Sequence, residues 1–205
     1  MKKQILMMIG LAMLLPSAMQ ANQELLAKSI KDTQVETTRT ATQLRATLNA
    51  LNALTKQSSG DLRPAYTTFS SEVANTEGAA RWTATRAAWM ASDGRQYFQS
   101  WQTTINGIAN ESLRKKAQKR LTSVQKSYGK VEVALKEAGA KFKPLLSDLS
   151  DIQKTLAADV TPAGVKAAKS SVSSANSNHK SVTKAINDAL EEMDDMSKSL
   201  SSAAN

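Results

Sequence analysis

Residues 117–156 read AQKRLTSVQKSYGKVEVALKEAGAKFKPLLSDLSDIQKTL, and the spacing of their apolar residues decides the fold. The gaps alternate strictly between four and three residues, at Ala117, Leu121, Val124, Tyr128, Val131, Leu135, Ala138, Phe142, Leu145, Leu149, Ile152 and Leu156. Such a seven-residue repeat keeps one stripe of an α-helix facing a partner helix over many turns. We therefore expect one helix over residues 110–158, roughly 70 Å long at ~1.5 Å per residue. Other helices must run beside it to cover the stripe.

Three further segments carry the same repeat, over residues 23–58, 62–108 and 162–200. Short connections place sequential helices side by side, so the sequence predicts an all-α fold, an elongated antiparallel four-helix bundle or coiled coil. The two middle helices are the longest, and their ends should project past the outer pair. Pro144 removes one backbone hydrogen bond inside the third helix, which predicts a kink near residues 140–144 rather than an end.

Two of the helices should pack less tightly than the others. The stripe of the first helix contains threonines, whose hydroxyl groups need partners when buried; they are Thr33, Thr37, Thr40 and Thr47. The last helix holds six serines between Ser170 and Ser181. We expect the first helix to be the loosest of the set and the packing along this serine-rich segment to be thin.

The first twenty-one residues are typical of a secretory signal peptide. Lys2 and Lys3 precede an apolar run over residues 5–15 and a tail of small residues over 16–21, the order found in such signals. A retained anchor is the alternative, but eleven apolar residues are too few for a membrane span, which needs about 20. We predict cleavage after Ala21 and a single helical domain over residues 22–205 in the periplasm. With no cysteine in the chain, it cannot be a lipoprotein.

The sequence offers little for catalysis. It has no cysteine, one histidine and no glycine-rich phosphate-binding motif, so nucleophile and base pairs, metal sites and nucleotide sites have few residues to be built from. His179 lies on the stripe of the last helix, where we expect a partly buried imidazole with a polar neighbour. We predict a protein that is not an enzyme and that has no cofactor.

Positive charge is concentrated in the first half of the third helix. The cations nearest its start are Arg114, Lys115, Lys116, Lys119 and Arg120, and we call them the basic tip. Folding the last two helices as a hairpin about residue 160 leaves these residues opposite the uncharged end of the chain, so we expect five cations with no acidic neighbour. Lys126 and Lys130 instead lie level with the acidic residues 188–195, which predicts pairing between the two helices. The basic tip is either a solvated face or a site for an anionic surface.

Trp82 and Trp89 are seven residues apart and one position off the main stripe of the second helix. They therefore share a helix face. We expect them to widen the buried side of that helix. The alternative is an exposed pair, which would mark a contact surface.

One run of residues is not explained by the seven-residue repeat. It comprises Phe98, Trp101, Ile105, Ile108, Asn110, Ser112, Leu113 and Arg114. With the segments Gly60-Asp61-Leu62 and Lys141-Phe142-Lys143-Pro144-Leu145-Leu146, it resembles a family of bacterial envelope proteins, the domain-of-unknown-function family 2959. The resemblance covers residues 30–202. It implies a helical, coiled-coil-rich exported protein and brings no activity and no catalytic residues. Many members look like lipoproteins, from which this chain departs because it has no cysteine.

Two functions remain open from the sequence. The first is a structural or interaction protein of the cell envelope, working as a scaffold through its helix surfaces. The second is a binding module whose basic tip contacts an anionic polymer or membrane surface. The partner is then an envelope protein or an anionic surface, with no intracellular nucleic acid, and the chain itself could oligomerise. An exposed apolar stripe would favour the first hypothesis, and a contiguous positive end the second.

Overall fold

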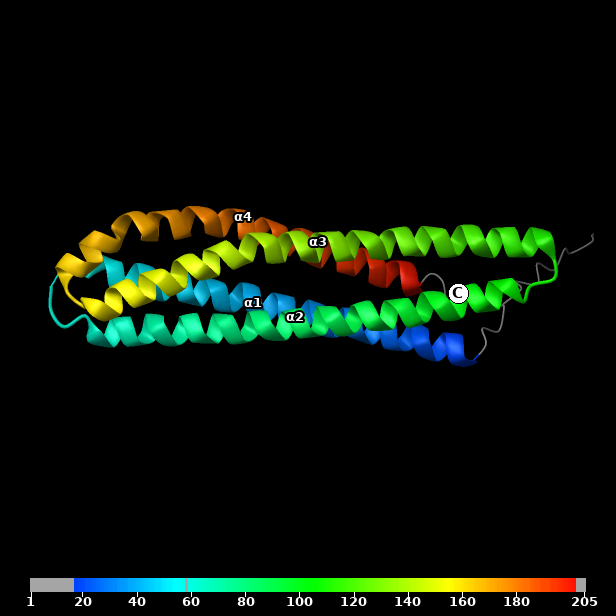
Figure 1. Ribbon diagram of the computed structural model, residues 1–205, viewed down its shortest axis with the longest axis horizontal. Helices are drawn as coiled ribbons and strands as arrows, with labels where there is room; N and C mark the ends of the chain where they lie inside the picture. The colour runs from blue at the N-terminus through cyan, green and yellow to red at the C-terminus, as the bar shows by residue number, and fades with distance from the viewer. Residues whose placement is uncertain (1–16, 58, 202–205) are drawn as a thin grey trace, which may run out of the picture.

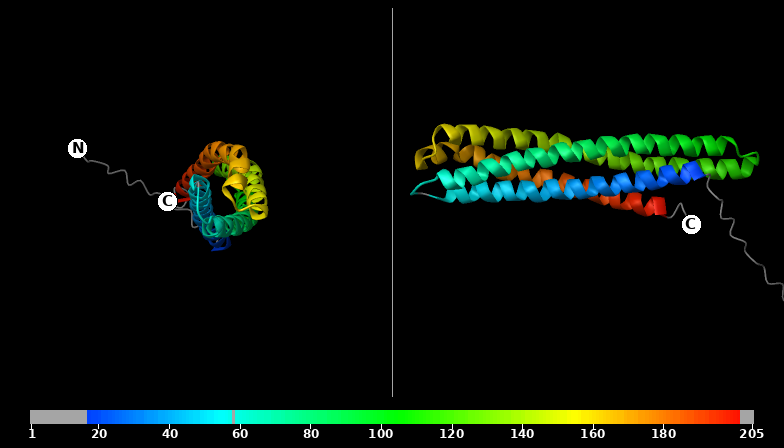
Figure 2. Two further views of the ribbon diagram at one scale, coloured as in Figure 1. Left: turned by 90° about the vertical axis from the view of Figure 1, so that its left-hand side faces the viewer. Right: turned by 90° about the horizontal axis from the view of Figure 1, so that it is seen from below.

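The computed structural model describes residues 17–57 and 59–201, and this part of the chain forms four long helices. They are α1 (Ser17–Lys56), α2 (Arg63–Asn106), α3 (Glu111–Ala158) and α4 (Pro162–Ser201). Figure 1 shows them running antiparallel in sequence order, and the end-on view in Figure 2 shows them arranged in a ring. Each helix contacts two neighbours, most extensively within the α1–α2 and α3–α4 pairs. The predicted elongated four-helix bundle is confirmed.

The turns between the helices are capped by side-chain hydrogen bonds. Asn110 Oδ1 accepts a hydrogen bond from the Leu113 N–H at 3.0 Å, and Thr161 Oγ1 accepts one from the Gly164 N–H at 3.2 Å. Both bonds satisfy amides that have no partner within the first turn of a helix. Gly60 has a φ of 88°, a left-handed conformation that favours glycine. Asp61 Oδ1 accepts from the Arg63 N–H at 3.0 Å at the start of α2.

The first helix begins earlier than predicted. α1 starts at Ser17 rather than near residue 23, so it includes the last residues of the predicted signal peptide. Nothing between Ser17 and Ala21 breaks a helix, and Met19 is buried among residues of all four helices. The other predicted signal residues, 1–16, lie outside the described part of the chain. Cleavage after Ala21 stays a prediction.

The two middle helices project beyond the outer pair at one end. α2 and α3 have 44 and 48 residues, against 40 each for α1 and α4. In Figure 1 the green turn between α2 and α3 extends past the blue start of α1 and the red end of α4. α3 passes through Pro144 as one helix, and its yellow C-terminal part is inclined to its green N-terminal part (Figure 1). The basic tip belongs to this projecting end.

The apolar stripes bury two separate cores. The loop-end core, nearest residues 57–62 and 159–161, is built mainly from leucine, valine and alanine, including Leu51, Leu149 and Val172. The tip-end core, toward residues 107–110, contains Tyr97 and Tyr128 together with tryptophan and methionine. Nearly all stripe positions predicted for α1, α3 and α4 are buried. The stripe of α2 is half-exposed between residues 80 and 87, between the two cores.

The threonines of α1 do not loosen it. Thr40 and Thr83 hydroxyl groups lie 2.9 Å apart, and Thr47 Oγ1 lies 2.7 Å from Thr76 Oγ1. Because these small side chains bond across the interface, α1 and α2 approach closely without leaving most hydroxyl groups unpaired. The expectation that α1 is the loosest helix is wrong, since its contact with α2 is the most extensive in the bundle.

Candidate functional site

The basic tip lies on the first three turns of α3. Arg114, Lys115, Lys116 and Lys119 are exposed and Arg120 is half-buried. Residues 111–120 carry a net charge of +4, and residues 98–104 of the facing helix α2 carry no charge. The projecting end of the bundle is therefore electropositive.

The tip cations are more engaged than the sequence suggests. Lys115 Nζ lies 2.7 Å from Glu111 Oε1, one helical turn earlier. Arg120 Nη2 donates to the Ser199 carbonyl at 3.1 Å and so contacts the end of α4. The expectation of five cations without an acidic neighbour is wrong, because Glu111 lies on the same helix face as Lys115. In the described part of the chain, Lys116 and Lys119 form no ion pair.

The charge pairing predicted between the last two helices is present at one place. Lys130 Nζ lies 3.8 Å from Glu192 Oε2, close to the register given by a hairpin about residue 160. Lys126 forms no ion pair with a described residue. Asp188 and Asp194 instead pair within α4, with Lys184 and Lys198, each at 2.6 Å. Pairs this exposed stabilise the bundle little, and of these three only the Lys130–Glu192 pair joins two helices.

Trp82 and Trp89 are exposed, which corrects the prediction that they widen the core. Their exposed fractions are 51% and 50%. Met90, the residue after Trp89, is buried on the main stripe. Each residue step turns an α-helix by about 100°, so the two indoles lie on the outside of α2. The buried stripe of α2 is therefore narrower than the spacing alone indicates.

The two indoles belong to a mixed surface, which we call the tryptophan face. Its residues lie on α1 and α2 and are Leu25, Lys28, Asp32, Val35, Trp82, Arg86 and Trp89. Leu25 and Val35 are exposed by 50% and 54%. The α1 members and the α2 members each follow a spacing of three and four residues, so each set shares one helix face. This second, weaker repeat beside the core stripe is the signal that could have identified the face from the sequence.

Arg86 holds the tryptophan face together. Its guanidinium carbon lies 4.8 Å from the centroid of the Trp89 ring, a cation–π contact. Its Nη1 lies 3.4 Å from Asp32 Oδ2. Asp32 also accepts a hydrogen bond from Lys28 Nζ at 2.8 Å, and this bond, with the charges of Lys28 and Arg86, lowers the pKa of the Asp32 carboxyl group. The α1 and α2 sides of the face are thus fixed relative to each other.

A shallow hollow lies in this face between α1 and α2. Its volume is about 340 Å³, and its walls include Leu25, Asp32, Arg86, Trp89 and Asp93. The walls therefore combine apolar surface with charges of both signs. Such a surface suits a partner that inserts an apolar group and forms hydrogen bonds around it.

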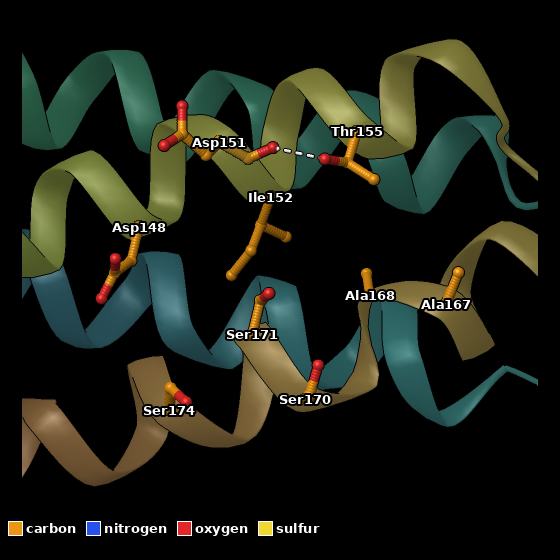
Figure 3. Close-up of a pocket in the computed structure, with 9 residues that line it drawn as sticks. All are labelled: Asp148, Asp151, Ile152, Thr155, Ala167, Ala168, Ser170, Ser171 and Ser174. Atoms are coloured by element: carbon orange, nitrogen blue, oxygen red, sulfur yellow. Dashed lines mark hydrogen bonds between the residues drawn. The ribbon is translucent and has the colours of Figure 1, made fainter.

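The serine-rich segment of α4 leaves a second hollow, about 360 Å³ in volume (Figure 3). The figure shows Asp148 and Ile152 of α3 pointing toward α4 and Ser171 of α4 pointing toward Ile152, while the Asp151 side chain points away from α4. Small serine side chains do not fill the space between the helices, as predicted. Both carboxylates already have partners, because Asn178 Nδ2 donates to Asp148 at 3.3 Å and Lys154 Nζ donates to Asp151 at 3.1 Å. The hollow is therefore a consequence of thin packing.

His179 is half-buried and has a polar neighbour, as predicted. One ring nitrogen, Nε2, lies 3.0 Å from Thr183 Oγ1. Burial, followed by the charge of Arg45, lowers the pKa of His179. Within residues 17–57 and 59–201, no three histidine, aspartate or glutamate side chains are grouped so that they could hold a metal ion. No described helix has a stretch long and apolar enough to cross a membrane.

The comparison with protein families agrees with the resemblance seen in the sequence. The family model described as protein of unknown function (DUF2959) matches residues 18–200, so the chain belongs to this family. No curated protein and no solved structure matches the chain.

Proposed function

We propose that this member of the DUF2959 family is an exported scaffold of the cell envelope that binds a partner protein through its tryptophan face. The observation that carries the proposal is the pair of half-exposed indoles on one face of α2. Tryptophan and arginine are the residues most enriched among those that dominate binding energy at protein interfaces. Trp82, Arg86 and Trp89 are residues of these two types, and they lie on consecutive turns of one helix.

The physical character of the face supports a protein partner. Leu25 and Val35 add exposed apolar surface, and the charges of Lys28, Asp32 and Arg86 lie between the apolar residues. Protein interfaces are enriched in aromatic residues and arginine and combine apolar contacts with hydrogen bonds. Because Arg86 is already held by Asp32 and Trp89, binding would require little further ordering of this side chain.

The first residues of the chain support export. Lys2 and Lys3, the apolar run over residues 5–15 and the small residues up to Ala21 match a secretory signal. We place the exported protein in the periplasm and assign it no catalytic activity. Its rigid, elongated bundle would hold a partner at a defined distance, which is the work of a scaffold.

Site-specific photocrosslinking in cells tests the proposal. A photoreactive phenylalanine analogue replaces Trp82 or Trp89. Val133 of α3, which is 66% exposed, provides a control position with more access to solvent than either tryptophan. We expect the same discrete adduct from both tryptophan positions and none from position 133. The absence of an adduct at both positions, or the same adduct at all three, would contradict a specific tryptophan face.

A second candidate function rests on the basic tip. Lys116 and Lys119 are exposed and unpaired within the described residues, at the projecting end of the bundle. Like charges three and four residues apart on a helix repel one another, and Arg114, in the first turn of α3, also opposes the helix dipole. An anionic surface would remove this cost, so the tip could bind acidic headgroups or cell-wall polymer.

Sedimentation with vesicles that contain phosphatidylglycerol tests this candidate. Replacing Lys115, Lys116 and Lys119 with Gln should abolish a salt-sensitive association, while helix content stays constant and the melting temperature stays the same or rises. The matched control replaces Lys126, Lys136 and Lys143, exposed residues of the same helix, with Gln. If the tip variant binds like the parent at low salt, or if the parent does not bind, the tip is a solvated face.

A further inference from the structure

The loop-end half of the bundle has a basic side that differs from both the tryptophan face and the basic tip. It is formed by residues 37–56 of α1 and 162–187 of α4, which together contain seven lysine and arginine residues and no aspartate or glutamate. α1 and α4 are neighbours in the ring (Figure 2). On the other side, residues 63–83 of α2 carry two basic and two acidic residues, and residues 135–158 of α3 carry four and three. Positive charge in this half is therefore concentrated on one side of the bundle.

Most of these cations have no acidic partner. Arg39 and Lys184 pair with acids that lie outside the two segments, Glu36 and Asp188. The other five are exposed and form no ion pair with a described residue; they are Arg45, Lys56, Lys166, Lys169 and Lys180. Because like charges held together repel one another, an anionic ligand at this side would relieve the repulsion.

The five unpaired cations follow the seam between α1 and α4. Those on α4 are three and eleven residues apart and those on α1 are eleven apart, spacings that place each set on one helix face. Between them, the amide groups of Asn52 and Asn176 bond across the seam at 3.0 and 2.9 Å. From Lys166 to Lys180 the α4 cations extend over about 21 Å, at ~1.5 Å per residue. The positive charge thus forms a line rather than a point.

A hollow of about 430 Å³ opens in this seam near the loops. Lys56, Lys166 and Lys169 line it, and the buried Val165 and Val172 contribute to its floor. Side chains that form hydrogen bonds complete much of the lining; they are Thr55, Gln57 and Ser173. The volume lies within the range of small-molecule sites, about 300–1,000 Å³. The hollow therefore combines positive charge with neutral hydrogen-bonding groups.

The uncharged surface of this side is hydrophilic. None of the large apolar side chains that are exposed in the described part of the chain lies in either segment. Hydroxyl and amide side chains instead occupy exposed positions between the cations, such as Thr42, Asn49, Ser173 and Ser177. This composition offers little apolar contact to a protein partner or to the acyl chains of a membrane. It suits a hydrated polymer that carries negative charge.

We infer that the basic side binds a linear acidic polysaccharide. Its carboxylate groups pair with the five cations along the seam, and its hydroxyl groups bond with the serine, threonine and asparagine side chains between them. One sugar unit occupies the hollow beside Lys56, Lys166 and Lys169. The inference rests on neither proposed function, since this side lies at the opposite end of the bundle from the basic tip and on a different helix pair from the tryptophan face.

Isothermal titration calorimetry of the exported protein with short alginate oligomers, whose sugar units all carry a carboxylate, tests the inference. We expect binding that weakens as salt is added, and no binding of uncharged dextran. Replacing Lys56, Lys166 and Lys169 with Gln should lower the affinity about tenfold and make it less dependent on salt, because fewer counterions are released. All three side chains are exposed, so helix content and melting temperature should not change.

The matched control is the basic-tip variant with Lys115, Lys116 and Lys119 replaced by Gln. It loses the same charge from the other end of the bundle and should bind alginate like the parent. Absence of binding in the parent, or equal binding when the three lysines of the hollow are replaced, overturns the inference. Loss of binding in the tip variant alone also overturns it, because the polymer would then bind the basic tip.

Polyglutamate separates a polysaccharide site from a surface that attracts any polyanion. It carries carboxylates without sugar hydroxyl groups and should bind more weakly than alginate. Ser173→Ala should lower the affinity for alginate about fivefold, the factor for one hydrogen bond, and leave that for polyglutamate unchanged. Ser170→Ala, on the α3 side of the same helix, should change neither. Equal or tighter binding of polyglutamate to the parent overturns the polysaccharide as the ligand.

Discussion

The loop-end core and the tip-end core fill the same four-helix arrangement with different residues. In the loop-end core, Leu51, Leu145 and Leu149 interleave at regular spacing. In the tip-end core, the rings of Tyr97 and Trp101 lie 5.5 Å apart between centroids, and those of Phe98 and Tyr128 lie 5.4 Å apart. Aliphatic residues can fill a regular stripe in many ways, whereas packed rings need particular neighbours. The tip-end core should therefore be the less tolerant of substitution.

Gly94 and Tyr128 show this dependence most directly. The Tyr128 hydroxyl donates to the Met90 carbonyl at 3.0 Å, so its ring lies across α2. A Cβ atom added at Gly94 would lie 2.7 Å from Tyr128 Cζ. Gly94 is therefore required for the close approach of the ring, although α2 continues through this glycine without interruption.

The largest effect that we predict separates Gly94 from a glycine without such a neighbour. Gly94→Ala should lower the free energy of unfolding by about 2 kcal/mol, because overpacking outweighs the gain in helix propensity. Gly129→Ala, with nothing within 4 Å of its added Cβ, should raise it by up to about 1 kcal/mol. Urea unfolding measures both. Equal stability of the two variants would mean that the Tyr128 ring moves aside freely. It would contradict the expectation that the tip-end core is the less tolerant of substitution.

The same contrast explains how much could be predicted from the sequence. The four helices, their turns and the register between α3 and α4 follow from periodicity and from residues such as Asn110 and Thr161, because these signals act locally along the chain. The contact between Gly94 and Tyr128 was not predictable, since it joins two helices through a single side chain. Taken along the chain alone, Gly94 is only a residue that weakens a helix.

The candidate site was predicted less well, for a related reason. Periodicity gives the direction of a side chain around the helix, but the width of the buried stripe depends on how many neighbours cover it. Trp82 and Trp89 lie one position from the stripe, so the width of the buried stripe decides whether they are buried. The pairing of Lys115 with Glu111 was readable from their spacing of four residues, whereas the contact of Arg120 with Ser199 required the structure.

A second prediction, of intermediate size, compares two tyrosines within the tip-end core. Tyr128→Phe removes a hydrogen bond to the Met90 carbonyl and should lower the free energy of unfolding by about 1 kcal/mol. The Tyr97 hydroxyl is buried without a partner among the described residues. Tyr97→Phe should therefore leave stability unchanged or raise it. Urea unfolding of both variants tests whether only the Tyr128 hydroxyl has a partner. An equal loss of stability in both variants would show that the Tyr97 hydroxyl also has one.

The smallest predicted effect is a different pH response at each end of the bundle. Burial raises the pKa of Tyr97 to about 12, and burial with the charge of Glu132 raises the pKa of Tyr128 as well. Folding thus favours the neutral phenol, and the unfolded chain loses these protons first as pH rises above about 10. By linkage, stability from the tyrosines is complete below pH 10 and falls as pH rises further. The tip-end core should weaken on the alkaline side.

His179, beside the loop-end core, should respond on the acid side. Its pKa is lowered by burial and by Arg45, so the unfolded chain takes up a proton first as pH falls through about 6.5. Its contribution to stability is complete above that pH and decreases below it. His179→Gln should flatten the stability profile between pH 7.5 and 5.5 without changing it above pH 9. The double variant Tyr97→Phe, Tyr128→Phe should flatten the profile above pH 10 and leave the acid side unchanged. If either variant altered both sides, the two ends of the bundle would not titrate independently.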